Sequence, residues 1–193
     1  MNLNLETERL LLRPLAESDL DIAIAILADP EVMWFVVEPT PPETVTEQMP
    51  TFVRRGGGGC IGIWCVVEKA TGDKLGTGIL LPLPIEEEDT DWSLVGGPGL
   101  PDREIEVGYL LKKSAWGKGY ATEIAGRLLR FAFEETPLEE VVAVIDDRNE
   151  ASRRVLKKCG MIEEGPRPAY ATMAPGFRLT RAQWLEMNSK ASG

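Results

Sequence analysis

The hydrophobic pattern along the chain alternates between two periods, one typical of strands and the other of helices. Runs rich in Val, Ile, Leu and Trp suit a pleated sheet and predict strands at residues 5–14, 61–68, 75–83, 103–111, 141–145 and 177–179. Apolar residues spaced three and four apart predict helices at residues 20–27, 43–54, 120–135, 149–160 and from 180 onward. This order of elements predicts one mixed α/β domain over residues 1–193.

Local signals mark where several elements begin and end. Ser18 and Asn149 are expected to be helix N-caps, and Gly160 is placed to be a C-cap. The apolar run 32–37, which contains Trp34, is interpreted as core rather than as the wall of a substrate site. Residues 165–176 are rich in Pro and Gly, and we assign no strand to them.

The least regular stretch lies near residues 84–102 and leads into the strand at 103–111. It begins with an acidic run at 86–91 and ends with Gly and Pro. An irregular segment of this length inside a compact domain is usually functional or unstructured. Two interpretations stay open: a solvated loop, or a flap that brings negative charge to a substrate site.

Composition and charge narrow the function classes. The chain is 44% hydrophobic and 27% charged, as in a soluble globular protein, and its net charge of −10 works against nucleic-acid binding. No apolar stretch is long enough to span a membrane and the first residues do not resemble a secretory signal, so a cytoplasmic protein is expected. Three cysteines and no histidine disfavour zinc chemistry and Ser-His or Cys-His catalysis, so no metal is expected. Proton transfer then falls to carboxylates, Tyr, Ser or water.

The stretch at 114–123 joins the strand at 103–111 to the helix at 120–135 and carries the clearest binding signal. Gly117 and Gly119 can adopt backbone angles closed to other residues, while Lys118 adds a positive charge. A helix N-terminus after such a turn presents free backbone N–H groups to a phosphate. The spacing matches neither a Walker A loop nor a full dinucleotide fingerprint, because Thr122 stands where the third glycine would be. For this stretch taken alone, an ordinary strand–helix turn is the alternative.

A second stretch, from Asn149 to Met161, predicts a capped helix. In the stretch at 114–123, Trp-Gly-Lys-Gly-Tyr-Ala-Thr-Glu follows a Tyr-Leu pair after five intervening residues. The stretch from Asn149 to Met161 has the form Asn-x-x-Ser-x-x-Val-x-x-Lys-x-Gly-Met. With the opening Thr-x-Arg-Leu-x-Leu-Arg at 7–13, the chain resembles the GCN5-related N-acetyltransferase (GNAT) family, in the branch that acetylates ribosomal-protein N-termini. The two motifs have the order and spacing of that family's two coenzyme A motifs.

The resemblance implies a fold and a cosubstrate. The fold is a twisted, mainly antiparallel sheet of six to seven strands, with splayed central strands and helices on both faces. Acetyl-CoA would lie in the opening, with its pyrophosphate on the N–H groups of 117–122 and its pantetheine amides along 110–112. The implied cofactor contacts are Leu110, Leu111, Lys112, Trp116, Gly117, Lys118, Gly119, Tyr120, Ala121, Thr122, Asn149 and Ser152.

Candidate catalytic residues follow from the central strand and the second motif. Glu104 and Glu106 lie two residues apart and so point to the same side of a regular strand. Related enzymes often carry a general base on this strand. Glu106 is preferred and Glu104 is second, because Glu106 lies closer to Gly108 and Tyr109; two exposed carboxylates at a strand start are the alternative. Leu156 stands where many members carry a Tyr that protonates the leaving thiolate. Ser152 is a candidate for that role.

The resemblance therefore implies acetyl transfer from acetyl-CoA to a primary amine by direct attack in a ternary complex. The acceptor is open between a protein or peptide N-terminus and a small molecule such as a polyamine, an aminoglycoside or an amino acid, and Tyr170 is a candidate to reach it. A non-catalytic acyl-CoA-binding sensor or interaction module is the alternative, because a fold alone does not fix function. Neither nucleic acid nor a membrane is an expected partner. A homodimer, common in similar proteins, is left open.

Overall fold

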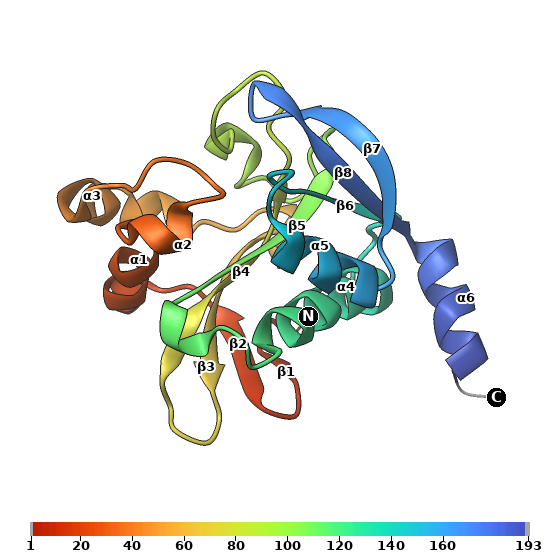
Figure 1. Ribbon diagram of the computed structural model, residues 1–193, viewed down its shortest axis with the longest axis horizontal. Coiled ribbons are helices and arrows are strands. Elements are labelled where there is room, and N and C mark those ends of the chain that lie inside the picture. Colours follow the sequence, from red (N-terminus) through yellow and green to blue (C-terminus); the bar gives the residue numbers. More distant parts are fainter. Residues whose placement is uncertain (1, 192–193) are drawn as a thin grey trace.

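The computed structural model describes residues 2–191, which form a twisted sheet flanked by helices (Figure 1). Residues 1, 192 and 193, which the predicted domain includes, lie outside the described residues. Neighbouring strands follow the order β1-β2-β3-β4-β5-β6-β8-β7, and each pair is antiparallel except β5 and β6. The strands are β1 (Leu5–Glu6), β2 (Leu10–Pro14), β3 (Gly62–Glu68), β4 (Lys74–Pro82), β5 (Ile105–Leu111), β6 (Glu140–Val144), β7 (Ile162–Ala169) and β8 (Thr172–Thr180).

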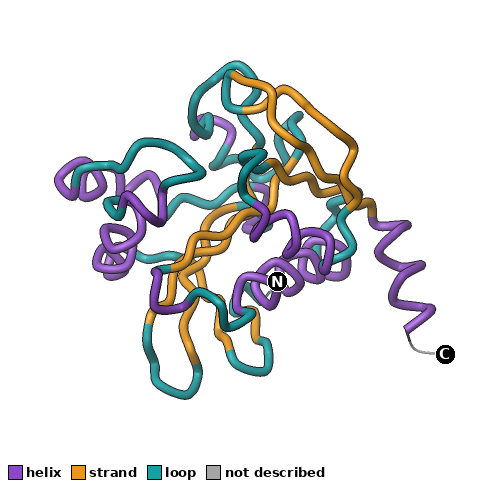
Figure 2. The backbone as a smooth tube through the Cα atoms, in the orientation of Figure 1, coloured by secondary structure: helices purple, strands orange, loops and turns teal. Residues whose placement is uncertain are grey.

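Helices lie on both faces of this sheet (Figure 2). They are α1 (Leu20–Leu27), α2 (Pro30–Met33), α3 (Pro42–Phe52), α4 (Tyr120–Glu135), α5 (Glu150–Lys158) and α6 (Arg181–Ala191). The mixed α/β, mainly antiparallel architecture confirms the predicted fold class. The sheet has eight strands within the described residues, one more than the upper end of the predicted range.

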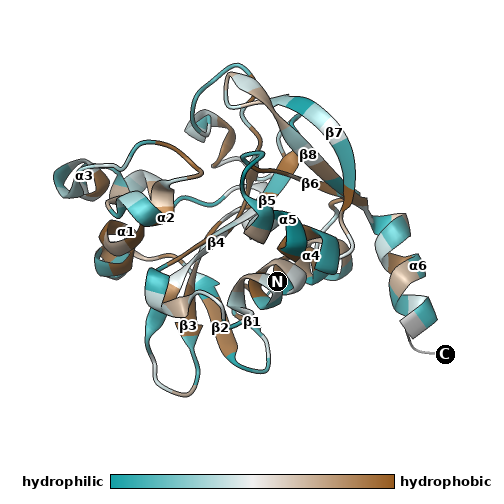
Figure 3. Cartoon of the chain, viewed as in Figure 1, coloured by the Kyte–Doolittle hydropathy of each residue, from teal (hydrophilic) through white to brown (hydrophobic). Residues whose placement is uncertain are grey.

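The two faces can be followed in β3, where successive side chains alternate between them. Trp64 and Val66 join the core cluster that contains α4, and Trp64 packs edge-on against Phe131 at 5.6 Å between ring centroids. Cys65 joins a second cluster, formed with the apolar sides of α1 and α3. Hydrophobic residues accordingly run along the central strands, while α5 carries a hydrophilic outer side (Figure 3).

The central strands β5 and β6 diverge from one another. They share one register pair, Glu106 with Val142, whereas β5 pairs with β4 continuously, from Pro82 and Ile105 to Gly76 and Leu111. Beyond Glu106, the side of β5 that would face β6 therefore lacks a paired strand. This confirms the splayed central strands of the predicted fold.

The start of the first helix differs from the prediction. Ser18 lies inside a short 3-10 turn, Glu17–Asp19, so the prediction that it caps the helix is wrong. The neighbouring Asp19 carboxylate accepts a hydrogen bond from the Ala16 backbone N–H at 3.0 Å and a bidentate pair from Arg13 at 2.6 and 2.7 Å. A carboxylate can satisfy more donors than the Ser hydroxyl can, which explains why the turn is organised around Asp19.

Two further expectations are corrected. In the run 32–37, Val32 and Met33 are buried as predicted, but Trp34 is 68% exposed, so the core interpretation holds only for the first residues. The Pro- and Gly-rich segment at 165–176, to which no strand was assigned, forms most of the β7–β8 hairpin. β7 lies at the edge of the sheet, where a proline loses no essential backbone hydrogen bond.

Candidate functional site

The glycine loop, residues 114–119, connects β5 to the N-terminus of α4. Gly117 and Gly119 both adopt positive φ, 72° and 82°, which favours glycine because a side chain would be strained there. The Glu123 backbone N–H donates to the Gly119 carbonyl at 3.2 Å, which starts the helical pattern of hydrogen bonds. The N–H groups just before Glu123 have no acceptor within the helix, and the helix dipole adds positive potential there. A Cβ at Gly117 would meet nothing within 4 Å, so the backbone is open to a ligand.

Arg9, from the turn between β1 and β2, ties this loop to the rest of the fold. Its Nε donates to Glu123 Oε2 at 2.8 Å, and its Nη1 donates to the Lys118 carbonyl at 3.0 Å. The Arg9 guanidinium also lies 4.5 Å from the centre of the Tyr120 ring. One side chain thereby fixes the last turn of the loop and the first turn of α4.

The open edge of β5 leads towards the glycine loop. The Lys112 N–H donates to the Leu75 carbonyl at 2.9 Å, so it points to β4. Since backbone groups alternate in direction along a strand, those of Tyr109 and Leu111 point to the opposite side, where β6 has diverged. Part of this edge is occupied, because the Trp116 indole N–H donates to the Leu111 carbonyl at 2.7 Å.

α5 brings the Ser152 side chain close to Tyr109 of β5. Asn149 caps α5, accepting from the Ser152 backbone N–H at 3.1 Å, as the sequence predicted. The Tyr109 hydroxyl is buried and makes no hydrogen bond with any described residue. Burial raises the pKa of Tyr109 to about 12, while the nearby Ser152 side chain lowers it. Leu156 is 2% exposed and packs in the core, so it has no polar role.

Glu106 is the buried carboxylate of the site, with 4% of its surface exposed. The Tyr170 hydroxyl donates a hydrogen bond to Glu106 Oε1. Burial raises the pKa of Glu106 to about 7, with Tyr170 and Arg167 lowering it and the negative charge of Asp89 raising it. A carboxyl group in this range exchanges protons near neutral pH, as a general base must.

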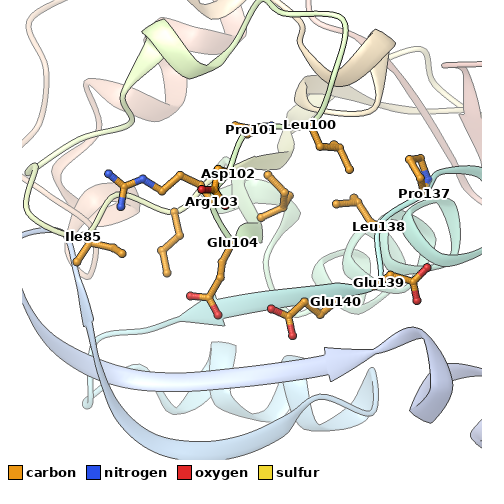
Figure 4. Close-up of a pocket in the computed structure, with 12 residues that line it drawn as sticks. Ile85, Leu100, Pro101, Asp102, Arg103, Glu104, Pro137, Leu138, Glu139 and Glu140 are labelled. Atoms are coloured by element: carbon orange, nitrogen blue, oxygen red, sulfur yellow. The ribbon is translucent and has the colours of Figure 1, made fainter.

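Glu104 has a different environment. It forms ion pairs with Arg167 and, at 2.8 Å, with Arg178, so its charge is neutralised by the β7–β8 hairpin. It also lines a cavity of about 470 Å³ at the entry ends of β5 and β6. Figure 4 shows its carboxylate beside that of Glu140, and both carboxylates pair with Arg178. The cavity lies at the opposite end of β5 from the glycine loop. Its carboxylates Glu104 and Glu140 are already ion-paired with Arg178.

Most of the predicted cofactor-binding residues lie at or near the C-terminal end of β5. Trp116 to Thr122 form the loop and the first turn of α4 after that strand, and Ser152 lies near Tyr109 and donates its backbone N–H to Asn149. The Lys112 backbone N–H points towards β4, and because backbone groups alternate along a strand, those of Leu110 point the same way. Glu106 and Glu104 have different surroundings: Glu106 is buried against Tyr170, whereas Glu104 is ion-paired.

Three contributors were missed or only partly anticipated. Arg9 was noted as part of a motif, but its contacts with the glycine loop could not be foreseen. From the sequence, no role is assigned to the buried Tyr109 hydroxyl, although a Tyr within the apolar run 107–111 is a usable signal. Tyr170 was a candidate to reach an acceptor, and its bond to Glu106 appears only in the fold.

The described residues contain neither a metal-binding cluster nor a membrane-spanning helix. Across residues 2–191, no group of three or more His, Cys, Asp and Glu side chains is arranged to hold a metal ion. Nor does that part of the chain contain a helix long and apolar enough to cross a membrane.

The chain is similar to a known family of proteins and to a curated relative. A family model of the acetyltransferase (GNAT) domain matches residues 9–162. The FsC-acetyl coenzyme A-N(2)-transacetylase of Aspergillus fumigatus is 32% identical over 192 residues, which cover 95% of this chain and 78% of the relative.

Solved structures share the fold at lower identity. A GNAT-family acetyltransferase from Bacillus anthracis superposes with a TM-score of 0.71 at 20% identity, covering 93% of this chain and 99% of the other. The spermidine N-acetyltransferase of Vibrio cholerae, solved with CoA and spermine, gives a TM-score of 0.70 at 16% identity, again with 93% and 99% covered.

Proposed function

The chain belongs to the acetyltransferase (GNAT) family, and on that premise we propose that it transfers an acetyl group from acetyl-CoA directly to a primary amine within a ternary complex. The acceptor is a small-molecule amine or a free peptide or protein N-terminus. The observation that carries the proposal is the union of an anion-binding helix N-terminus with a splayed strand edge and a buried carboxylate of raised pKa.

The donor side of the proposal uses backbone groups. The N–H groups of residues 117–122 would hold the pyrophosphate, and Lys118 would add positive charge. The exposed edge of Tyr109 and Leu111 would hydrogen-bond the pantetheine amides as an added strand does. Acetyl-CoA supplies the activated acetyl group. Asn149 and Ser152 would contact it from α5, with Ser152 placed to give a proton to the departing sulfur.

The acceptor side uses Glu106. Most amines are protonated near pH 7, so the attacking nitrogen must first lose a proton, and a carboxylate with a pKa about 7 can take it. Holding the two reactants together in one opening would lower the activation free energy of acetyl transfer further; in the most favourable geometry this contributes roughly 7 kcal/mol or more. A strand N–H beside the acetyl carbonyl would stabilise the negative charge that develops on its oxygen.

Charge near Glu106 bears on the choice of acceptor. The acidic loop, residues 84–102, places Asp89 close enough to raise the pKa of both Glu106 and Tyr170. This supports the flap interpretation over that of a loop without a role, and it favours an acceptor with a second positive charge. The likeness to an enzyme solved with spermine points the same way.

Thermal melting followed by a CoA-release assay tests the proposal. Acetyl-CoA at 100 times its Kd should stabilise the protein by about 2.7 kcal/mol, a rise of roughly 5–10 °C in melting temperature, while ATP and NAD give no rise. CoA release is then measured with spermidine, kanamycin, a free amino acid and a short peptide with a free N-terminus. A shift without release for any amine would favour the sensor alternative, for which Leu156 in place of the usual Tyr is the supporting observation.

A matched pair of glycine variants ties the shift to the glycine loop. Gly119→Glu and Gly72→Glu replace glycines of similar φ, 82° and 78°, and Gly72 lies in the turn between β3 and β4. Both should lose about 1–2 kcal/mol of stability through backbone strain. The shift with acetyl-CoA should vanish in Gly119→Glu and persist in Gly72→Glu; its survival in both would remove the loop from the binding site.

A further inference from the structure

We propose that Tyr170, rather than Glu106 directly, meets the acceptor amine and passes its proton on to Glu106. The inference rests on the proposed acetyl transfer and names a catalytic residue for it. Its first ground is access: Glu106 is 4% exposed, and its carboxylate accepts a hydrogen bond from the Tyr170 hydroxyl. The lone pairs of that hydroxyl can accept a proton while its own proton leaves, which no other group bonded to Glu106 offers within the described residues.

The backbone that holds Tyr170 also supports a functional role for this residue. Tyr170 and Ala171 form the two-residue turn of the β7–β8 hairpin with φ of 52° and 56°, a conformation that normally calls for Gly or Asn. Such strain is unfavourable for residues with a side chain and concentrates at functional sites. The turn is held by two bonds of 3.0 Å, from the Tyr170 N–H to the Pro84 carbonyl and from the Ala171 N–H to the Ile85 carbonyl.

The hairpin is also anchored beneath Tyr170. Ala169 is fully buried in a small cluster with Leu83 and Val142, and Tyr170 packs on the same cluster. These contacts hold Tyr170 beside Leu83 and Val142, and its hydroxyl is directed at Glu106. A side chain that only filled space would need neither the strained turn nor the hydrogen bond.

The third ground is the charge around the pair. Two charges act on the pKa of Glu106 in addition to the Tyr170 hydrogen bond: Asp89 of the acidic loop raises it and Arg167 of β7 lowers it. Burial and the adjacent carboxylate raise the pKa of Tyr170 far above its usual value, so the hydroxyl does not ionise by itself. It can act only by giving its proton to Glu106 as it receives another, which is the definition of a relay.

The acceptor arrives as an ammonium group and loses two protons from its nitrogen. The first goes to the Tyr170 oxygen as the Tyr170 proton goes to Glu106 Oε1, and Glu106 then releases a proton to solvent through Tyr170. The neutral nitrogen forms a bond to the acetyl carbon, the carbon–sulfur bond of the thioester breaks, and the second nitrogen proton leaves by the same route. The sulfur leaves as a thiolate and takes a proton from solvent, directly or through the Ser152 hydroxyl, so one proton is released for each acetyl group transferred.

The test compares Tyr170→Phe, Glu106→Gln and the double variant by CoA release from acetyl-CoA and the most active amine of the panel. A relay predicts that each single variant loses about 10²-fold or more in kcat at pH 7 and that the double variant loses no more than either. A plot of the wild-type kcat against the mole fraction of D₂O in the solvent should also be curved, because two protons move in the same step. Met173→Ala, an exposed change on the same hairpin, should keep the wild-type rate.

Three results would overturn the relay. If Tyr170→Phe keeps kcat within threefold while Glu106→Gln does not, the amine reaches Glu106 directly. If raising the pH restores Tyr170→Phe, the hydroxyl only lowers the pKa of Glu106 and is a positioning residue. If the wild type releases no CoA with any amine despite a melting shift with acetyl-CoA, the proposed function fails and the relay fails with it. Persistence of that shift in Tyr170→Phe shows that the variant is folded.

Discussion

The glycine loop and the Glu106–Tyr170 pair flank the same strand, since Glu106 stands near the start of β5 and the loop follows its end. The loop takes its shape from neighbouring residues: two glycines of positive φ and the first turn of α4. The pair joins residues 64 apart in the chain, and Tyr170 is placed by contacts with the segment after β4. The conformation of the donor side is thus encoded mainly by neighbouring residues and is braced by the distant Arg9, whereas the acceptor side is assembled by tertiary structure.

The sharpest way to separate the two sides is to remove the base. Glu106→Gln keeps the shape of the side chain but cannot accept the proton, so kcat should fall about 10²- to 10⁴-fold with the Kd for acetyl-CoA unchanged. Steady-state kinetics and calorimetric titration measure the two quantities. Glu104→Gln, which breaks the ion pairs with Arg167 and Arg178, should change kcat less than tenfold. Equal losses in both variants would contradict the distinction between these carboxylates.

The same substitution should change the pH dependence of stability. Because burial raises the pKa of Glu106 from 4.5 to about 7, the folded state holds a proton that the unfolded state releases between these values, and stability falls as pH rises across them. Glu106→Gln removes this term and should be more stable than wild type at pH 8 by up to about 3 kcal/mol, with little difference below pH 5. Urea unfolding at pH 5, 6, 7 and 8 measures it. A constant difference between the two proteins would show that Glu106 is not buried as described.

A third change probes the donor side through tertiary structure. Arg9→Ala removes the bonds to Glu123 and to the Lys118 carbonyl, so the Kd for acetyl-CoA should rise about tenfold, or 1.4 kcal/mol, with kcat at saturation nearly unchanged. Arg130→Ala breaks an exposed pair with Glu134 further along α4 and should leave the Kd as it is. If both variants bind acetyl-CoA like the wild type, the donor side is purely local.

The smallest expected effect concerns the acidic loop. Asp89→Asn removes a negative charge near Glu106 and should raise the KM for spermidine about two- to fivefold, less so at high salt. Asp73→Asn, in the turn between β3 and β4, is the matched charge change away from the site and should have no effect. A KM for spermidine that is the same in both variants would assign the loop no part in attracting the acceptor.

The sequence predicted the fold well where one physical signal dominated. The helix α4 has the predicted bounds, because its apolar spacing is unbroken and Pro137 follows its end. The strand predicted at 177–179 lies within β8, but β7 and the first part of β8 were not predicted. Pro166 and Pro168 argue against a strand, and the position of β7 at the sheet edge makes them tolerable.

The candidate site divides in the same way. The glycines and the Asn149 cap are properties of a few adjacent residues, so they could be identified without the fold. The pairing of Glu106 with Tyr170 and the contacts of Arg9 depend on which distant segments meet, and no local pattern contains that information. Glu106 was preferred over Glu104 before its partners were known.

The bond from the Arg9 backbone N–H to Glu123 closes a separation of 114 residues. Contacts so distant along the chain form slowly during folding, because the intervening loop must be closed first. The N-terminal turn must therefore dock before the first turn of α4 is fixed, however early that helix forms on its own. In a refolding experiment, the capacity to bind acetyl-CoA should appear with the slow formation of these long-range contacts rather than with the fast rise in helix content. Ligand binding would then report on the last stage of folding.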